Sequence, residues 1–183
     1  MDQTRFKRLI VMNTFLPTGE PAGKGFNDWR DFCNRSPDMD VGRVIARGTP
    51  HLTPAEVEAY NAPFPSPAHK AGVRRFPNIV MTDPEMQGVD VSKRAKAMYE
   101  TSDKFKAEDV FVAVGMKDPV LGPPMMRQLV KMWKNGYMWT EVSEAGHFVQ
   151  EWGEEVARKV IEAFETHRMP DGVTRKQGRG SKL

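Results

Sequence analysis

Two apolar runs, far apart in the chain, constrain the fold more than any other feature. Residues 5–14, RFKRLIVMNT, and residues 108–118, EDVFVAVGMKD, each contain an almost continuous apolar segment of strand length. Such segments are typical of strands buried on both faces, as in a parallel sheet. A third strand is expected at residues 137–143, YMWTEVS. The sequence therefore predicts an α/β protein with three parallel strands.

The long segment between the first two runs predicts an all-helical insertion. Helical patterns separated by prolines occur in FNDWRDFCNR, DVGRVIARG, TPAEVEAYN and VSKRAKAMYETSDKF. Thr53 and Glu56 have the spacing of a capping box, and Pro54 suits the first position of that helix. Residues 61–77, NAPFPSPAHKAGVRRFP, contain four prolines, and we expect them to be largely irregular.

The chain then divides into four predicted segments. Two further helices are expected after the second and third strands, in PPMMRQLVKMWKNG and QEWGEEVARKVIEAFETH. The segments are a first core strand (1–15), a helical cap with its return connection (16–107), a strand–helix–strand–helix core (108–168) and a flexible basic tail (169–183).

Composition excludes several classes of protein. With 39% hydrophobic and 28% charged residues, the 183-residue chain has a globular composition. No apolar run reaches the roughly 18 residues of a membrane span, and residues 1–8, MDQTRFKR, lack the apolar region of a secretory signal, so we expect none. The net charge of +3 is carried by residues 169–183, so we expect no nucleic-acid partner. A lone Cys33 fits a reducing compartment.

Two titratable residues lie where α/β sheets carry their chemistry, beyond the carboxyl ends of strands. Asp118 follows VFVAVG, and His147 follows YMWTEVSEAG with one helix between the two sites. In hydrolases of this chain order, the acid fixes the tautomer of the histidine and stabilises its cation, while the histidine is the general base. We predict these two roles for Asp118 and His147.

Each residue also has a structural interpretation when it is taken alone. His147 suits a helix N-terminus, and Asp118 suits the turn in GMKDP. The pairing and the order favour the catalytic interpretation. No set of His, Cys, Asp and Glu has the spacing of metal ligands, and no glycine loop has the pattern of a phosphate site. We therefore expect no metal and no cofactor.

A nucleophile is not found in these residues. A nucleophile elbow requires Ser, Asp or Cys flanked by glycines two positions away on each side, between a strand and a helix. No Ser, Asp or Cys in the 183 residues has this flanking, and Cys33 lies in the predicted cap helix DFCNR.

Five segments, in the same order, resemble the haloalkane dehalogenases of the α/β-hydrolase superfamily. They are RFKRLIVMNT, GFNDWRDF, LTPAEVEAYNAPFPSPAHKAGVRRFP, VGMKDPVLGP and EAGHFVQEWGEEVAR. The resemblance covers about residues 5–166. It implies that the chain corresponds to the C-terminal part of that fold, with a helical cap. It implies hydrolysis of small apolar halogenated substrates through an alkyl-enzyme ester.

The resemblance also implies residue roles. Asp118 would orient the base, and His147 would activate the water that hydrolyses the ester. Trp29 would donate its indole N–H to the departing halide, a role that suits a group that donates but cannot accept. Further residues would line the apolar pocket: Phe26, Phe76, Val80, Val120 and Leu121.

The nucleophilic aspartate of that family lies upstream of the first strand seen here. We therefore expect the chain alone to be a truncated form, poorly stable and inactive towards haloalkanes. One alternative is an epoxide hydrolase-like enzyme, which needs cap tyrosines, and only Tyr60 has a suitable context. The other alternative is a catalytically inactive fragment or interaction module.

The last three residues, Ser181-Lys182-Leu183, match a peroxisomal import signal. We expect them to bind the peroxisomal import receptor if the source is eukaryotic. In any other source the expected location is cytoplasmic.

Overall fold

The computed structural model describes residues 5–179, which form two compact units. The core unit combines the segment up to Leu16 with the residues from Val91 onward, and the helical unit is Pro17–Asp90. The second boundary lies well before residue 107, the predicted end of the cap. Helix α5 (Val89–Thr101) runs into the core unit, where Tyr99 packs against Trp133 with ring centroids 6.2 Å apart.

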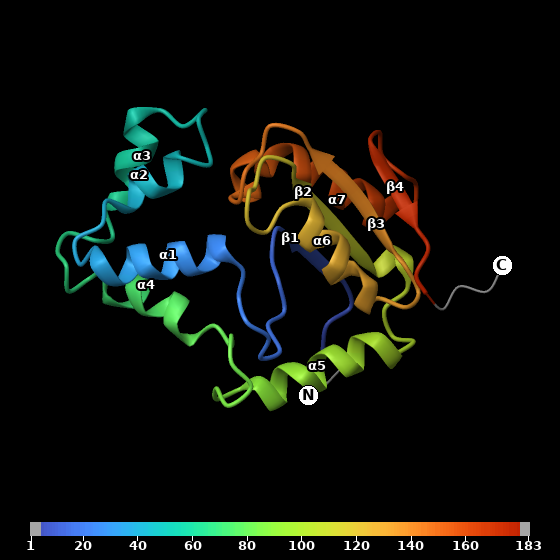
Figure 1. Ribbon diagram of the computed structural model, residues 1–183. Helices are drawn as coiled ribbons and strands as arrows, with labels where there is room; N and C mark the ends of the chain where they lie inside the picture. The colour runs from blue at the N-terminus through green and yellow to red at the C-terminus, as the bar shows by residue number, and fades with distance from the viewer. Residues whose placement is uncertain (1–4, 180–183) are drawn as a thin grey trace. The chain divides into compact units, whose positions relative to one another are not determined.

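The core unit is built on one sheet of four strands, in the spatial order β1-β2-β3-β4 (Figure 1). They are β1 (Leu9–Met12), β2 (Val110–Gly115), β3 (Tyr137–Val142) and β4 (Val173–Lys176). The first three strands are parallel, which confirms the predicted part of the sheet. All six residues of β2 are buried, as expected for a central strand covered on both faces.

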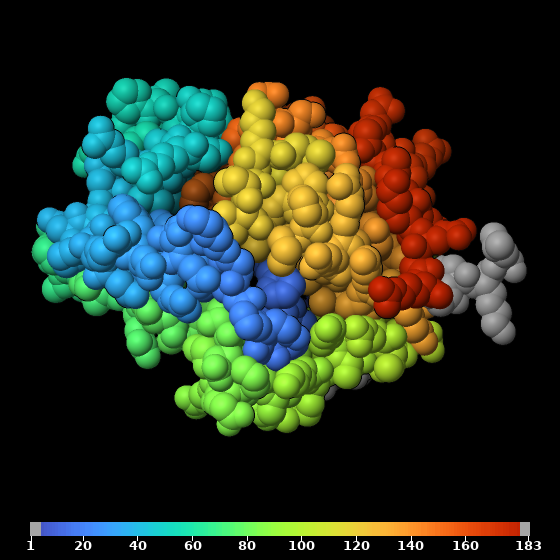
Figure 2. Space-filling model, in the orientation of Figure 1, coloured from blue at the N-terminus to red at the C-terminus, as the bar shows by residue number. Residues whose placement is uncertain are grey.

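Strand β4 was not predicted, and it corrects the expectation of a flexible tail after residue 168. It pairs antiparallel with β3, with Val173 opposite Thr140 and Lys176 opposite Tyr137. Only Val173 of its four residues is buried. The exposed Arg175 and Lys176 suit an edge strand, and Figure 2 shows this segment, in red, at the surface. One apolar residue is too weak a pattern to predict a strand.

Helices cover both faces of the sheet. Helix α7 (Gly153–Thr166) packs Val156, Val160, Ala163 and Phe164 against Phe111 and Met138 on one face. Helix α6 (Pro123–Leu129) and the following 3₁₀ turn η3 (Val130–Met132) cover the other face. Short 3₁₀ turns, η2 (Ala107–Asp109) and η4 (Val149–Trp152), precede β2 and α7. The result is a three-layer α/β arrangement.

The helical unit contains α1 (Lys24–Arg35), α2 (Val41–Ala46), α3 (Pro54–Asn61), α4 (Ala71–Arg75) and the 3₁₀ turn η1 (Phe76–Ile79). Its small core is formed by Cys33, Met39 and Val41. The capping box of α3 is confirmed, since Glu56 N donates to Thr53 Oγ1 and Thr53 N donates to the Glu56 carboxylate.

The segment 61–77 is less irregular than predicted. Its second half forms α4 and the start of η1. Three of its four prolines precede α4, where no helical hydrogen bond is lost. Pro77 stands in the first turn of η1, a position that needs no backbone donor.

Candidate active site

The acid–histidine pair is formed in the core unit, at the carboxyl ends of β2 and β3. His147 Nδ1 and Asp118 Oδ2 are 2.8 Å apart. The Asp118 side chain is 2% exposed, whereas that of His147 is 46% exposed. The structure therefore brings together the two residues that the sequence predicts as acid and base, one buried and one open to solvent.

The Asp118 carboxylate is fully hydrogen-bonded. Its Oδ1 accepts from the backbone N–H groups of Val120 and Leu121, at 2.8 and 3.0 Å. Burial by itself raises the pKa of Asp118, but the hydrogen bond from His147, the two backbone donors and Asn13 outweigh it and lower that pKa to about 2. The carboxyl group is thus ionised at neutral pH and accepts a hydrogen bond from the Nδ1–H group of His147.

This arrangement fixes the chemistry open to His147. An ionised carboxylate can only accept, so Nδ1 of the imidazole carries the proton that lies between them. In the neutral imidazole with this tautomer, Nε2 is the nitrogen that can take a proton from water, and the Asp118 charge stabilises the imidazolium that forms. The Phe148 ring lies edge-on to the imidazole, with centroids 5.1 Å apart.

Backbone contacts hold the two loops against each other. Met116 N donates to Val142 O at 3.2 Å, and Lys117 N donates to Ala145 O at 2.9 Å. The approach is so close that a Cβ atom on Gly115 would lie 2.1 Å from Gly146 O. Glycine at position 115 is therefore required by the neighbouring histidine loop.

Asn13 completes this site, although it is not among the site residues predicted from the sequence. It lies directly after β1, is 3% exposed, and its Nδ2 donates to Asp118 Oδ2 at 3.0 Å. A polar residue immediately after an apolar strand was the available signal, because the same rule about strand ends selected Asp118 and His147.

The other predicted site residues remain predictions in their side-chain roles. In the core unit, Val120 and Leu121 follow the acid, and Val120 is an exposed apolar residue. In the helical unit, Phe26 and Trp29 lie on α1 and are half-buried, Phe76 on η1 is 67% exposed, and Val80 follows η1. Trp29 stacks on Phe32, with ring centroids 5.7 Å apart.

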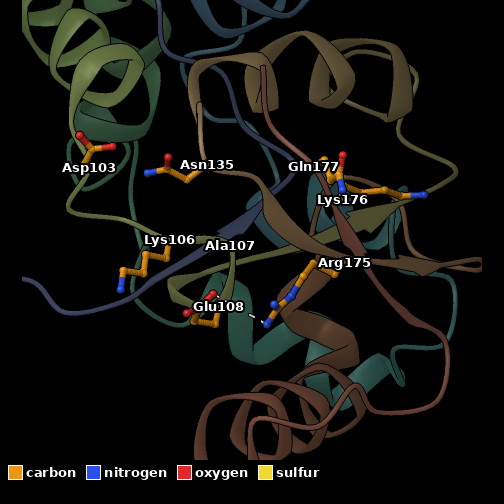
Figure 3. Close-up of a pocket in the computed structure, with 8 residues that line it drawn as sticks. All are labelled: Asp103, Lys106, Ala107, Glu108, Asn135, Arg175, Lys176 and Gln177. Carbon is orange, nitrogen blue, oxygen red and sulfur yellow. Dashed lines mark ion pairs between the residues drawn. The ribbon is translucent and has the colours of Figure 1, made fainter. Parts of the chain in front are cut away.

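A cavity of about 460 Å³ lies elsewhere in the core unit (Figure 3). It opens at the amino-terminal ends of β2 and β3, whereas the acid–histidine pair lies at their carboxyl ends. Its lining is mostly charged and includes an Arg175–Glu108 ion pair at 3.8 Å. The lining residues are Asp103, Lys106, Ala107, Glu108, Asn135, Arg175, Lys176 and Gln177. This cavity is therefore separate from the acid–histidine pair.

Among residues 5–179, no three His, Cys, Asp or Glu side chains are grouped as metal ligands would be. In the same range, no helix has the length and apolar character needed to cross a membrane.

The sheet topology and the acid–histidine pair at its strand ends define part of an α/β-hydrolase fold. No protein-family model matches the chain. It is 34% identical to the haloalkane dehalogenase of Psychrobacter cryohalolentis over 163 residues, which is 86% of this chain and 52% of that protein. It is 35% identical to haloalkane dehalogenase 1 of Mycobacterium tuberculosis over 164 residues, with the same shares.

Solved structures agree. Haloalkane dehalogenase DpaA of Paraglaciecola agarilytica NO2 has a TM-score of 0.82 and 36% identity, covering 89% of this chain and 54% of DpaA. Dehalogenase DatA of Agrobacterium tumefaciens C58, at 18% identity and a TM-score of 0.61, shows the same fold. In sequence and fold the chain is similar to haloalkane dehalogenases. It spans about half the length of the curated relatives it matches.

Proposed function

We propose that these residues form the acid, base and cap portion of a haloalkane dehalogenase-like hydrolase. The single observation that carries the proposal is the 2.8 Å contact between His147 Nδ1 and a buried, ionised Asp118. Such a pair can deprotonate a water molecule. The curated relatives of the chain are haloalkane dehalogenases.

The proposed reaction has two steps. A carboxylate displaces the halide from the substrate carbon and forms an alkyl ester. His147 Nε2 then takes a proton from water, which attacks the ester carbonyl and releases the alcohol and the free carboxylate. The sum is haloalkane plus water giving alcohol, halide and a proton. The 183 residues contain no nucleophile elbow, so we assign the attacking carboxylate to a segment outside them.

The outer edge of β1 supports this assignment. Within residues 5–179, β1 pairs only with β2, so its other edge has free backbone groups. Ile10 in this strand is 52% exposed. An apolar parallel strand with a free edge is suited to pair with a further strand, and such a strand would end beside Asn13 and the acid–histidine pair.

Trp29 is our candidate for the halide donor, and Trp29→Phe tests it. The substitution keeps the ring that stacks on Phe32 and removes only the N–H. Placed in the active chimera described in the next paragraph, the substitution is expected to lower kcat for halide release by about a hundredfold, the usual cost of one donor to a developing anion, with unchanged thermal unfolding. An unchanged kcat would assign Trp29 to packing alone.

Halide release tests the function. The 183-residue chain is compared with a chimera that adds the part of the Psychrobacter cryohalolentis enzyme outside the match. We expect a short 1-bromoalkane to be hydrolysed by the chimera and not by the chain alone. Turnover by the chain alone would show that our assignment of the nucleophile is wrong. No turnover by a folded chimera would favour the inactive interaction module.

We also propose that Ser181-Lys182-Leu183 directs import into peroxisomes in a eukaryotic cell where Leu183 is the carboxyl terminus. These residues lie outside the described range 5–179. A fluorescent protein ending in RKQGRGSKL is expected to enter peroxisomes, and the same fusion ending in RKQGRG is expected to stay in the cytosol. Equal distribution of the two would contradict the proposal.

A further inference from the structure

Asn13 connects the parts of the acid–histidine site more completely than its place at a strand end requires. Its side chain accepts from Gly115 N at 2.8 Å and donates to Gly115 O at 3.0 Å. It also contacts Asp118 Oδ2 at 3.0 Å and Gly146 O at 3.4 Å. One buried amide thus contacts the end of β2, the acid and the residue before His147.

The orientation of this amide is determined by its neighbours. The Gly115 N–H can only donate, so the Asn13 oxygen must face it. The Asn13 nitrogen then faces three acceptors, namely the Asp118 carboxylate and two carbonyls. A group at this position must therefore accept on one side and donate on the other, and asparagine does both.

Asn13 donates to the same Asp118 oxygen, Oδ2, that contacts His147. Oδ1 is held by the N–H groups of Val120 and Leu121, whereas Oδ2 accepts from both His147 and Asn13. Without Asn13, Oδ2 would have the exposed imidazole as its remaining partner. The carboxylate plane would then be fixed from one side only.

We propose that Asn13 is a positioning residue that sets the plane of the Asp118 carboxylate and, through it, the orientation of the His147 ring. A strand-end asparagine with a purely structural role would need only its two bonds to Gly115. The additional bond to Oδ2 is the one that the site uses. The inference rests on the proposed function only in treating His147 as a base.

The test is nuclear magnetic resonance of the full 183-residue chain, with the His147 Nδ1 proton as the signal. Asn13→Asp keeps the shape of the side chain and replaces the donor by an acceptor that faces Asp118. Asn13→Ala removes both groups. The control is Thr140→Val in the same sheet, which removes the bonds of Thr140 Oγ1 to Gly172 O and Lys159 Nζ and none to the acid–histidine pair.

We expect both Asn13 variants to speed solvent exchange of the Nδ1 proton by about tenfold or more, as for loss of one hydrogen bond to a charged group. We also expect a mixture of imidazole tautomers in these variants. Thr140→Val should keep the wild-type exchange and tautomer. Wild-type values in the Asn13 variants would overturn the proposal.

If neither Asn13 variant folds, a second measurement tests the contact between Asn13 and Asp118. In the otherwise native chain, Asp118→Asn should shift the Asn13 side-chain NH₂ resonances and leave those of the exposed Gln128 unchanged. Unshifted Asn13 resonances would contradict the contact. None of these signals depends on turnover, so a failed dehalogenase assay and a failed positioning role are distinguished.

Discussion

At the scale of single residues, the site is a buried carboxylate with a full set of partners beside an exposed imidazole. Four hydrogen bonds reach Asp118, from His147, Asn13 and two backbone N–H groups. They are what keeps a 2% exposed carboxyl group charged. A charged acid fixes the tautomer of His147, so the two residues form one functional unit.

The lowered pKa of Asp118 predicts an acid-dependent loss of stability. A carboxyl group whose pKa falls on folding stabilises the native state above its unfolded pKa of about 3.9. That contribution is lost as the pH falls through the native value of about 2. Urea unfolding at successive pH values should show this loss in the wild type. Asp118→Asn should be less stable at pH 6 and flatter between about pH 4 and pH 2.

Equal slopes for the two proteins in that window would contradict the assignment of the charge to Asp118. The substitution keeps the size of the side chain, so a difference in slope reports the lost titration.

Gly115 predicts a steric effect at the same site. Gly115→Ala would place a Cβ atom 2.1 Å from Gly146 O, so the histidine loop must move. We expect a loss of about 2 kcal/mol or more in the free energy of unfolding. Gly153→Ala, at the start of α7 with nothing within 4 Å of its Cβ position, is the control and should be close to neutral. Similar losses for both would refute the close approach.

At the scale of elements, β1 is an edge strand whose outer edge is neither covered nor charged among the described residues. It has four residues, pairs on one edge among the described residues, and exposes Ile10. Native proteins usually cover such an edge or place charges on it. At the other edge of the sheet, β4 carries the exposed Arg175 and Lys176, which make that edge unfavourable for further pairing.

Self-association through β1 is therefore expected, and Ile10→Lys should reduce it. A lysine on an exposed edge strand opposes edge-to-edge pairing, and folded stability should change by less than about 0.5 kcal/mol. Ile161→Lys on α7 is the matched control, because Ile161 is 54% exposed and belongs to a helix instead of an edge strand. Sedimentation velocity measures the association. Equal reduction by both substitutions would point to general hydrophobicity instead of the edge.

The elements that could be predicted are those with a strong apolar pattern. The buried β2 and the apolar face of α7 follow from their sequences, and so does the capping box of α3. Strand β4 could not be predicted, because one buried valine is too weak a pattern. The strand is stabilised by its backbone pairing with β3, which the local sequence does not show. Predicting the contact of Asn13 with Asp118 requires the order of the strands, because β1 pairs with β2 and the ends of the two strands lie side by side.

At the scale of the whole molecule, the described residues 5–179 combine a hydrogen-bonded acid–histidine pair with a sheet in which β1 is an edge strand. The residue types of the pair were predictable from their places after two strands, since parallel strands bring their carboxyl ends together. The support of that pair comes from segments 105 residues apart in the chain, as the Asn13–Asp118 bond shows. The place of Asn13 after an apolar strand was a local signal, but its contact with Asp118 follows only from the order of the strands in the sheet.

The central claim is that His147 hydrolyses an alkyl-enzyme ester, and intact-mass spectrometry of the chimera tests it most directly. With His147→Ala and a short 1-bromoalkane, we predict one equivalent of released halide and a protein whose mass has increased by the alkyl group. The chimera with His147 intact should release halide continuously and keep its original mass. Continuous turnover at the wild-type rate by His147→Ala, without a mass increase, would contradict the account.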